Sequence, residues 1–297
     1  MVYDCIIIGA GPAGLSAAIY LGRANKKTLL VYGGPRRTAL AAHIQNYLGF
    51  IDVSGPELLN RGMEQAEKYG VKIIVAAVKK TRQKDETFEI DTAEGMFSAR
   101  NIVAASGIDD VLPDIDNIYE FIGETFYTCL DCDGYHLIGR RVCIIGQGDG
   151  TARTALAAKQ LYTDKIAVCA GEDSSMGEGY LNRLQREDIR LIQKNAVHIN
   201  GKNGVVESVI LDDDSILECD CILSDMGYAR NDSFLSDLQL ERSRDGFIKV
   251  DENYESSVKR LYVVGPLNTG PDQVSVAVGE GARCAMHIVE TELSLSP

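Results

Sequence analysis

The sequence predicts an α/β fold with two doubly wound domains, the second of them inserted into the first. A strand, a glycine-rich turn and a helix follow one another at the start of the chain, and the same succession recurs near its middle. The end of the chain then returns to the pattern of the beginning. This is the order of elements that an inserted domain produces.

The first domain begins with the short apolar run of residues 5–8, which predicts a buried strand. Residues 9–14 form the glycine-rich turn, and the small and apolar side chains of residues 15–21 suit a buried helix. Residues 28–32 then predict a second strand parallel to the first. Together these segments make a strand–helix–strand unit.

The turn of the first domain is a complete GxGxxG formed by Gly9, Gly11 and Gly14, with Pro12 and Ala13 between the last two glycines. The first glycine allows the tight turn, the second lets the backbone approach a pyrophosphate, and the third lets helix and strand pack closely. The helix N-terminus then receives the anion. The alternative is a coincidental glycine-rich turn, but both flanks are correct, so we predict a Rossmann-like dinucleotide site.

The second domain repeats the succession, with a strand over residues 141–145, a turn over 146–151, a helix over 152–162 and a strand over 165–169. Two such units indicate two domains built on one plan.

The closing part of the chain predicts one more buried strand over residues 261–265 and a helix over 273–290. We therefore expect residues 1–117 and 247–297 to form one discontinuous domain, with residues 118–246 inserted between its two parts.

Composition excludes several classes of protein. The chain has 297 residues, 45% of them hydrophobic and 25% charged, which is typical of a globular protein with two domains. Its net charge of −13 argues against nucleic acid or an anionic membrane surface as a partner. No apolar run has the length of a membrane span, and no signal peptide is recognisable, so we expect a cytoplasmic protein.

Eight cysteines in a reducing compartment do not indicate a disulfide scaffold, so a close pair points to chemistry. Cys129 and Cys132 form a CxxC motif, whose spacing suits an exchangeable disulfide, and Asp133 beside it could shuttle a proton. A structural metal and inert thiols remain as alternatives, although further ligands at metal spacing are lacking and we expect no metal site. Cys143 and Cys169 lie in apolar strands, where a thiolate is disfavoured.

Across nearly its whole length the chain resembles the low-molecular-weight thioredoxin reductases, which are FAD-dependent disulfide oxidoreductases. Besides the N-terminal glycines, the resemblance rests on these segments: Asn46-Tyr47-Leu48-Gly49, Ala105-Ser106-Gly107, Cys129-Leu130-Asp131-Cys132-Asp133-Gly134-Tyr135, Met226-Gly227-Tyr228 and Gln273.

This resemblance implies FAD on the discontinuous domain, a nicotinamide cofactor on the inserted one, and a homodimer. It also implies a dithiol that faces the flavin, with Asp133 as proton donor and a thioredoxin-like protein or small dithiol as substrate. The remaining flavin-site residues that it implies are Asn46, Ser106, Gly107, Gly265, Gln273 and Val274.

The second nucleotide site departs from this family. Thr151 replaces the last small residue of the turn and is expected to crowd the contact between helix and strand. NADPH-using relatives carry arginines for the 2′-phosphate after the next strand, where this chain has Gly171, Glu172 and, further on, Met176. We therefore predict an atypical member for which NADPH is not the electron donor.

Three readings of that site stay open. Glu172 or Asp173 could bind a free ribose hydroxyl, which would mean NADH or a second FAD. The site could instead be vestigial, with electrons entering from a ferredoxin or another carrier, or leaving to oxygen. The acidic residues could also have no specific role.

The flavin site departs in one place, since Pro266 follows Gly265 where the family has an aspartate that contacts the flavin. FAD is then held by the remaining contacts or by Asn268. The function predicted from these residues is electron transfer between FAD and the Cys129–Cys132 pair. An oxygen-using dithiol oxidase and a flavin-binding redox sensor without turnover are the alternatives.

Overall fold

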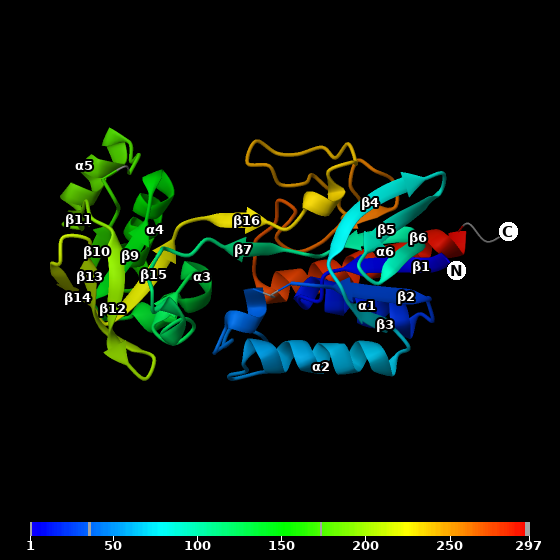
Figure 1. The fold of residues 1–297 in the computed structure, drawn as a ribbon, viewed down its shortest axis with the longest axis horizontal. Coiled ribbons are helices and arrows are strands. Elements are labelled where there is room, and N and C mark those ends of the chain that lie inside the picture. Colours follow the sequence, from blue (N-terminus) through cyan, green and yellow to red (C-terminus); the bar gives the residue numbers. More distant parts are fainter. Residues whose placement is uncertain (1, 35–36, 173, 295–297) are drawn as a thin grey trace. The chain divides into compact units, whose positions relative to one another are not determined.

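A computed structural model of the chain describes residues 2–34, 37–172 and 174–294. The chain forms two compact units, whose elements are labelled in Figure 1. The first unit contains the residues up to Leu40, Ile44–Asp109, and those from Arg230 onward. The second unit contains Ala41–His43 and Asp110–Ala229. The inserted order expected from the sequence is thus the order of the units.

The unit boundaries differ from the expected ones, because the chain enters the second unit after Asp109 and leaves it after Ala229. Ile115 is buried in a core cluster of the second unit, so its segment does not belong to the first. Phe234 and Leu235 are buried in a core cluster of the first unit. These apolar contacts set the boundaries, and no turn-rich linker marks them in the sequence.

The first unit contains a seven-stranded sheet in the order β3-β2-β1-β6-β5-β4, with β17 also paired to β6. Its elements are β1 (Val2–Ile8), α1 (Pro12–Arg23), β2 (Thr28–Tyr32), the 3-10 helix η1 (Arg37–Leu40), α2 (Gly55–Lys68), β3 (Lys72–Val75), β4 (Val78–Lys84), β5 (Thr87–Thr92), β6 (Gly95–Ala104), the 3-10 helix η4 (Ser233–Leu235), β17 (Leu261–Val263) and α6 (Val274–Ser294). The strands β3, β2, β1, β6 and β17 are parallel, whereas β5 pairs antiparallel with β6, and β4 pairs antiparallel with β5 at the edge of the sheet.

Helices α1 and α6 pack together against one face of this sheet (Figure 1). Their close contact requires Gly281, since a Cβ added there would lie 2.1 Å from the carbonyl oxygen of Ala13. The Ser16 hydroxyl of α1 donates a hydrogen bond of 2.7 Å to the carbonyl of Val278 in α6. The last helix of the chain therefore completes the core around the first glycine turn.

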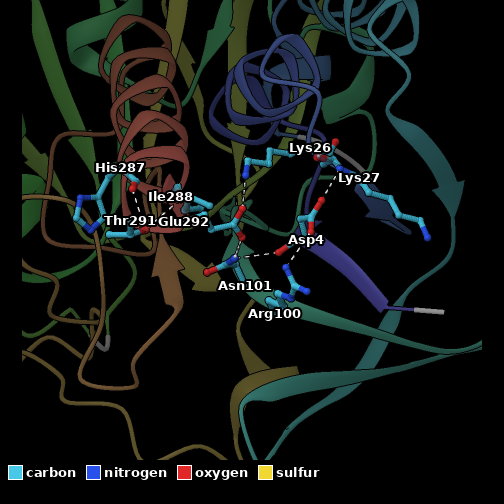
Figure 2. A network of polar contacts seen from close by, with 10 residues as sticks. Asp4, Lys26, Lys27, Arg100, Asn101, His287, Ile288, Thr291 and Glu292 are labelled. Carbon is cyan, nitrogen blue, oxygen red and sulfur yellow. Dashed lines mark hydrogen bonds and ion pairs between the residues drawn. The ribbon is translucent and has the colours of Figure 1, made fainter. Parts of the chain in front are cut away.

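A polar network fastens the last helix to the strands (Figure 2). Asn101 of β6 donates through Nδ2 to the carbonyl of Asp4, at 2.9 Å, and to the Glu292 carboxylate of α6, at 3.0 Å. Lys26 pairs with the same Glu292. The network thus joins the N-terminal strand to a helix that follows it only after the inserted unit.

The second unit contains a parallel five-stranded sheet in the order β11-β10-β9-β15-β8 and an antiparallel three-stranded sheet β12-β13-β14. Its elements are η2 (Ile118–Glu120), β8 (Phe126–Tyr127), α3 (Leu130–Asp133), η3 (Gly134–Leu137), β9 (Val142–Gly146), α4 (Gly148–Leu161), β10 (Ile166–Cys169), α5 (Glu178–Arg186), β11 (Arg190–Ile192), β12 (Ala196–Lys202), β13 (Val205–Leu211), β14 (Ile216–Glu218) and β15 (Cys221–Asp225). One apolar cluster joins α4 and α5 to the parallel sheet, and a second joins the smaller sheet to it.

Two short strands, β7 (Ile108–Asp110) and β16 (Tyr228–Arg230), carry the chain between the units and pair with each other. Among the helices of the described ranges, none is long and apolar enough to cross a membrane.

Candidate active site

The glycine turn of the first unit has the form that the sequence predicts. Gly9 has a φ of +115°, and a Cβ there would lie 2.3 Å from the carbonyl oxygen of Ala105. A Cβ on Gly14 would lie 2.0 Å from the carbonyl oxygen of Gly9. Gly11, by contrast, faces open space, since an added Cβ would meet nothing within 4 Å. The turn is therefore tight on its inner side and open on its outer side.

Helix α1 presents its positive end at this turn. It begins at Pro12, with Gly11 as the N-cap, and no side chain bonds to the cap. No acidic residue lies in its first turn. The backbone N–H groups of the first helical turn lack partners within the helix, and the helix dipole favours an anion beside them. The position suits a pyrophosphate.

A cavity of about 380 Å³ lies against this turn. The predicted flavin-site residues that line it are Gly9, Gly11, Pro12, Ala13, Ser106, Gly107, Gln273 and Val274. Asn46 does not line it but donates through Nδ2 to the Gln273 side chain, at 3.1 Å. Gly14 packs beneath the turn, and Gly265 packs against Ala13. Segments far apart in the sequence thus converge on one cavity.

The sequence reasoning missed a buried carboxyl group beneath this cavity. Glu280 of α6 is 4% exposed, and its Oε2 accepts hydrogen bonds from the Gly265 backbone N–H, at 2.5 Å, and from Asn268 Nδ2, at 2.8 Å. Burial raises the pKa of Glu280. An acidic residue among the apolar and small residues of the closing helix was the signal for it.

The suggestion that Asn268 could replace the flavin-contacting aspartate is wrong for this structure. The Asn268 side chain is committed to the protein, since its Nδ2 donates to Glu280 and its Oδ1 accepts from the Gly270 N–H at 2.6 Å. Asn268 is only 2% exposed. It supports the loop after β17 and has no donor left for a cofactor.

An acidic ferredoxin would need a basic patch, and the adjacent arginine pairs of this sequence are Arg36-Arg37 and Arg140-Arg141. Arg37 and Arg141 are paired with carboxylates. Arg37 lines the cavity of the first unit and pairs with Asp272 at 2.6 Å. Arg141 of the second unit pairs with Asp220 at 2.7 Å and with Glu218 at 2.5 Å. Arg36 lies outside the described residues. These pairs reduce the positive charge that either segment could offer to an acidic protein.

The second unit carries the predicted redox pair. Cys129 and Cys132 form a disulfide, with their Cα atoms 5.2 Å apart. Cys129 caps the short helix α3, and its sulfur accepts a hydrogen bond of 3.1 Å from the Cys132 backbone N–H. Cys132 is exposed, whereas Cys129 and Asp133 are partly buried. The pair is therefore accessible from solvent.

The buried thiols of the second unit have a different environment. Cys143 and Cys169 are unbridged and buried, as expected, and the Cys143 thiol lies 3.5 Å from the Cys169 sulfur, to which it donates. This hydrogen bond raises the pKa of Cys143 and lowers that of Cys169. A thiolate is thus disfavoured at Cys143, whose thiol is buried and donates this hydrogen bond. Among the described residues, no His, Cys, Asp and Glu side chains form a cluster suited to a metal ion.

The second glycine turn accommodates Thr151, contrary to the crowding expected from its branched side chain. Thr151 is fully buried, and its Oγ1 donates to the carbonyls of Gln147, at 3.2 Å, and of Asp225, at 3.3 Å. A Cβ on Gly146 would lie 2.4 Å from this hydroxyl oxygen, so the first glycine of the turn makes room for the threonine.

A second cavity, of about 360 Å³, lies beside this turn and is lined by Gly146, Gln147, Gly171 and Met226, among others. The Asn195 side chain covers Gly171, since a Cβ there would lie 2.4 Å from Asn195 Oδ1.

The positions where NADPH-using relatives carry arginines hold Gly171, Glu172 and Met176 here. Glu172 lies 3.6 Å from Lys194, and Met176 is buried in the apolar core. Asp173 lies outside the described residues. Among the described residues that line this cavity, none is a lysine or an arginine.

Comparison with known proteins shows which family the chain resembles in sequence and in fold. Residues 3–281 match the family model of the pyridine nucleotide-disulphide oxidoreductases. The thioredoxin reductase of Bacillus subtilis is 26% identical over 97% of this chain and 95% of its own length, and that of Treponema pallidum is 29% identical over 95% of each.

Solved structures show the same fold. The thioredoxin reductase of Streptococcus pyogenes superposes with a TM-score of 0.92 at 22% identity, over 99% of each chain. The atypical thioredoxin reductase of Desulfovibrio vulgaris Hildenborough is 31% identical over the whole of both chains, with a TM-score of 0.56.

The chain belongs to the pyridine nucleotide-disulphide oxidoreductase family and is a flavin-dependent oxidoreductase that acts on a disulfide or thiol group. Within that family it is a relative of the low-molecular-weight thioredoxin reductases. The residues of the first unit fit FAD, because the cavity, the open Gly11 and the uncharged start of α1 form the cradle that a dinucleotide needs.

Proposed function

We propose that this protein transfers electrons between FAD held by the first unit and the Cys129–Cys132 pair, and that NADPH is not its electron donor. The observation that carries the proposal is the contrast between the two nucleotide positions. The first has an open, uncharged turn, and the second lacks the cations of a 2′-phosphate site. Ferredoxin, a second flavin or another carrier is the donor that we infer.

When bound, FAD would accept and donate pairs of electrons. The Cys129–Cys132 disulfide takes up two electrons and two protons and opens to a dithiol, in a motif that Asp133 follows directly. One thiolate then attacks the disulfide of the substrate and forms a mixed disulfide, with the departing substrate sulfur leaving as a thiol. The second cysteine displaces the other substrate sulfur, which restores the internal disulfide.

The local geometry favours negative charge on Cys129 in the open state, because the Cys132 N–H already points at its sulfur. Asp133 is one residue beyond the pair, and its carboxyl group is the proton donor that we propose for thiol release.

The names of the relatives support a thioredoxin-like protein as substrate, and a small dithiol is the alternative. We also propose a cytoplasmic homodimer, which size measurement in solution and fractionation of cells would test.

The test uses the FAD-loaded protein without oxygen. Reduced viologen, an artificial donor, should bleach the flavin absorbance and support continuous reduction of a protein disulfide, whereas NADPH should do neither. Rapid stoichiometric bleaching by NADPH would refute the proposed donor assignment. Oxygen uptake driven by a small dithiol would instead identify an oxidase, and bleaching without any turnover would identify a redox sensor. The ratio of flavin to polypeptide in the purified protein gives the number of flavins bound per chain.

A further inference from the structure

The two glycine turns have equivalent neighbours, which allows a residue-by-residue comparison. In the first unit a Cβ on Gly9 would lie 2.3 Å from the carbonyl oxygen of Ala105. In the second unit a Cβ on Gly146 would lie 2.5 Å from the carbonyl oxygen of Asp225. Both contacts come from the residue at the end of the strand beside the glycine strand. Asp225 therefore holds the place that Ala105 holds in the first unit.

The two residues differ in charge at the start of the helix. Ala105 places only a methyl group beside Gly14, 3.2 Å from where a Cβ on that glycine would lie. Asp225 places its carboxylate beside the first turn of α4, with Oδ2 3.8 Å from where a Cβ on Gly150 would lie. Oδ2 is buried, and among the described residues it has no hydrogen-bond partner. The protein thus places a carboxyl group at the N-terminal, positive end of α4.

We propose that Asp225 is an internal anion that closes the second turn to the pyrophosphate of any dinucleotide. The inference rests on the proposed function and narrows it, because it excludes NADH and a second FAD as well as NADPH. A pyrophosphate needs the free N–H groups of the helix start and would meet a carboxylate of like charge in a buried, poorly screened place. The donor is then a carrier that does not dock through a dinucleotide pyrophosphate at this turn.

A second carboxylate in the same helical turn is already engaged. Asp149 Oδ1 accepts a hydrogen bond of 2.8 Å from the Gly177 N–H at the start of α5. Asp225 is therefore the residue whose removal should open the turn, since one oxygen of its carboxylate has no such partner in the part of the chain that the structure describes.

The test is calorimetric titration of the FAD-loaded full chain with inorganic pyrophosphate, and separately with NADH. FAD fills the first turn, so added pyrophosphate reports on the second. Asp225→Ala, which copies the first unit, and Asp225→Asn, which keeps the size, should both bind pyrophosphate at least about tenfold more tightly than the wild type. Asp114→Asn removes a carboxylate that lines the cavity beside this turn but is not part of the turn, and it should leave binding unchanged.

Equal pyrophosphate binding by the wild type and both Asp225 variants would overturn the proposal. A gain with Ala but not with Asn would overturn it too, since space and not charge would then close the turn. Disulfide reduction with the artificial donor, measured on the same samples, separates this result from the proposed function. If the wild type does not reduce the disulfide substrate, the proposed function is refuted, and the comparison of pyrophosphate binding still stands.

Discussion

The two glycine turns of this chain share a backbone plan, and the side chains around them differ in number and charge. In the first unit the turn meets Ala105 and an uncharged helix start, whereas in the second it meets Thr151, Asp149 and Asp225. The strand–turn–helix architecture is kept in both units. The comparison teaches that one strand–turn–helix plan can carry different side chains and a different charge at the start of its helix.

The candidate redox group of the second unit, the Cys129–Cys132 disulfide, lies away from the glycine turn of that unit. Its disulfide is carried by the short segment between β8 and β9, outside the glycine turn. Thr151 is compatible with the turn because its hydroxyl binds the Asp225 carbonyl. We therefore attribute the proposed closure of the second turn to the carboxylate of Asp225 and not to the branching of Thr151.

The largest expected effect tests the division of labour between the units. Cys129→Ser or Cys132→Ser should abolish disulfide reduction and leave FAD bound, because the cysteines belong to the second unit and the flavin cavity to the first. The measurement is protein-disulfide reduction with the artificial donor, with flavin content from absorbance. Cys221→Ser is the matched control, since burial raises the pKa of that thiol to about 12 and it should keep its activity. Full activity in the double variant Cys129→Ser, Cys132→Ser would refute the assignment.

The next largest effect is expected when the first turn is given the carboxylate that the second turn has. Ala105→Asp places a carboxylate at the start of α1, and we expect FAD affinity to fall by at least about a hundredfold. Ala105→Asn adds nearly the same volume without charge and should lose much less. Both variants are compared by equilibrium dialysis of FAD, with the Cys129–Cys132 thiol content as a check that the second unit folds. Equal losses in both variants would mean that volume, and not charge, limits the turn.

Sequence patterns were sufficient for the elements with strong local signals. The strand over residues 28–32 matches β2, and the two glycine turns, the closing helix and the CxxC motif lie where they were expected. The antiparallel pair β4 and β5 was not predicted. In β5 every second residue is buried, and in β4 only Thr81 is buried. Such signals are weak beside continuous apolar runs.

The parts of the site that the sequence did not predict depend on contacts between distant segments. Ser106, Gly107 and Gln273 could be proposed from the family resemblance, and they do line the cavity. Glu280 and Asp225 could not, because their roles follow from which backbone groups they meet. The sequence reveals the difference at Asp225 only when two segments are aligned. These are Ala105-Ser106-Gly107, which follows β6, and Asp225-Met226-Gly227, which begins with the last residue of β15.

A smaller effect concerns Thr151 in the second unit. Thr151→Gly restores the glycine pattern but removes the hydroxyl that binds the Asp225 carbonyl, so α4 should lose about 1–3 kcal/mol of local stability. Thr151→Ser keeps the hydroxyl and should lose less. Amide hydrogen exchange of α4 measures both values, and FAD content should not change. A glycine variant as stable as the wild type would show that the hydroxyl bond contributes nothing.

The smallest effect depends on pH and lies beneath the first turn. Burial raises the pKa of Glu280, so the folded chain holds this proton at a higher pH than the unfolded chain does. The stability that Glu280 contributes is therefore greatest at low pH and falls as the pH rises from the ordinary carboxyl range through the raised pKa. Glu280→Gln keeps an oxygen for the Gly265 N–H and Asn268 but cannot ionise.

We therefore expect the unfolding free energies of the wild type and the Gln variant to agree at low pH, with the wild type lower above that window. Glu280→Ala loses both hydrogen bonds and should be less stable at every pH, by about 1–3 kcal/mol. Denaturant unfolding of the FAD-loaded protein at several pH values makes the comparison. A constant difference between the wild type and the Gln variant across the pH range would contradict it. In that case Glu280 would stabilise the Gly265 segment through its hydrogen bonds alone, and ionisation of Glu280 would not lower the free energy of unfolding.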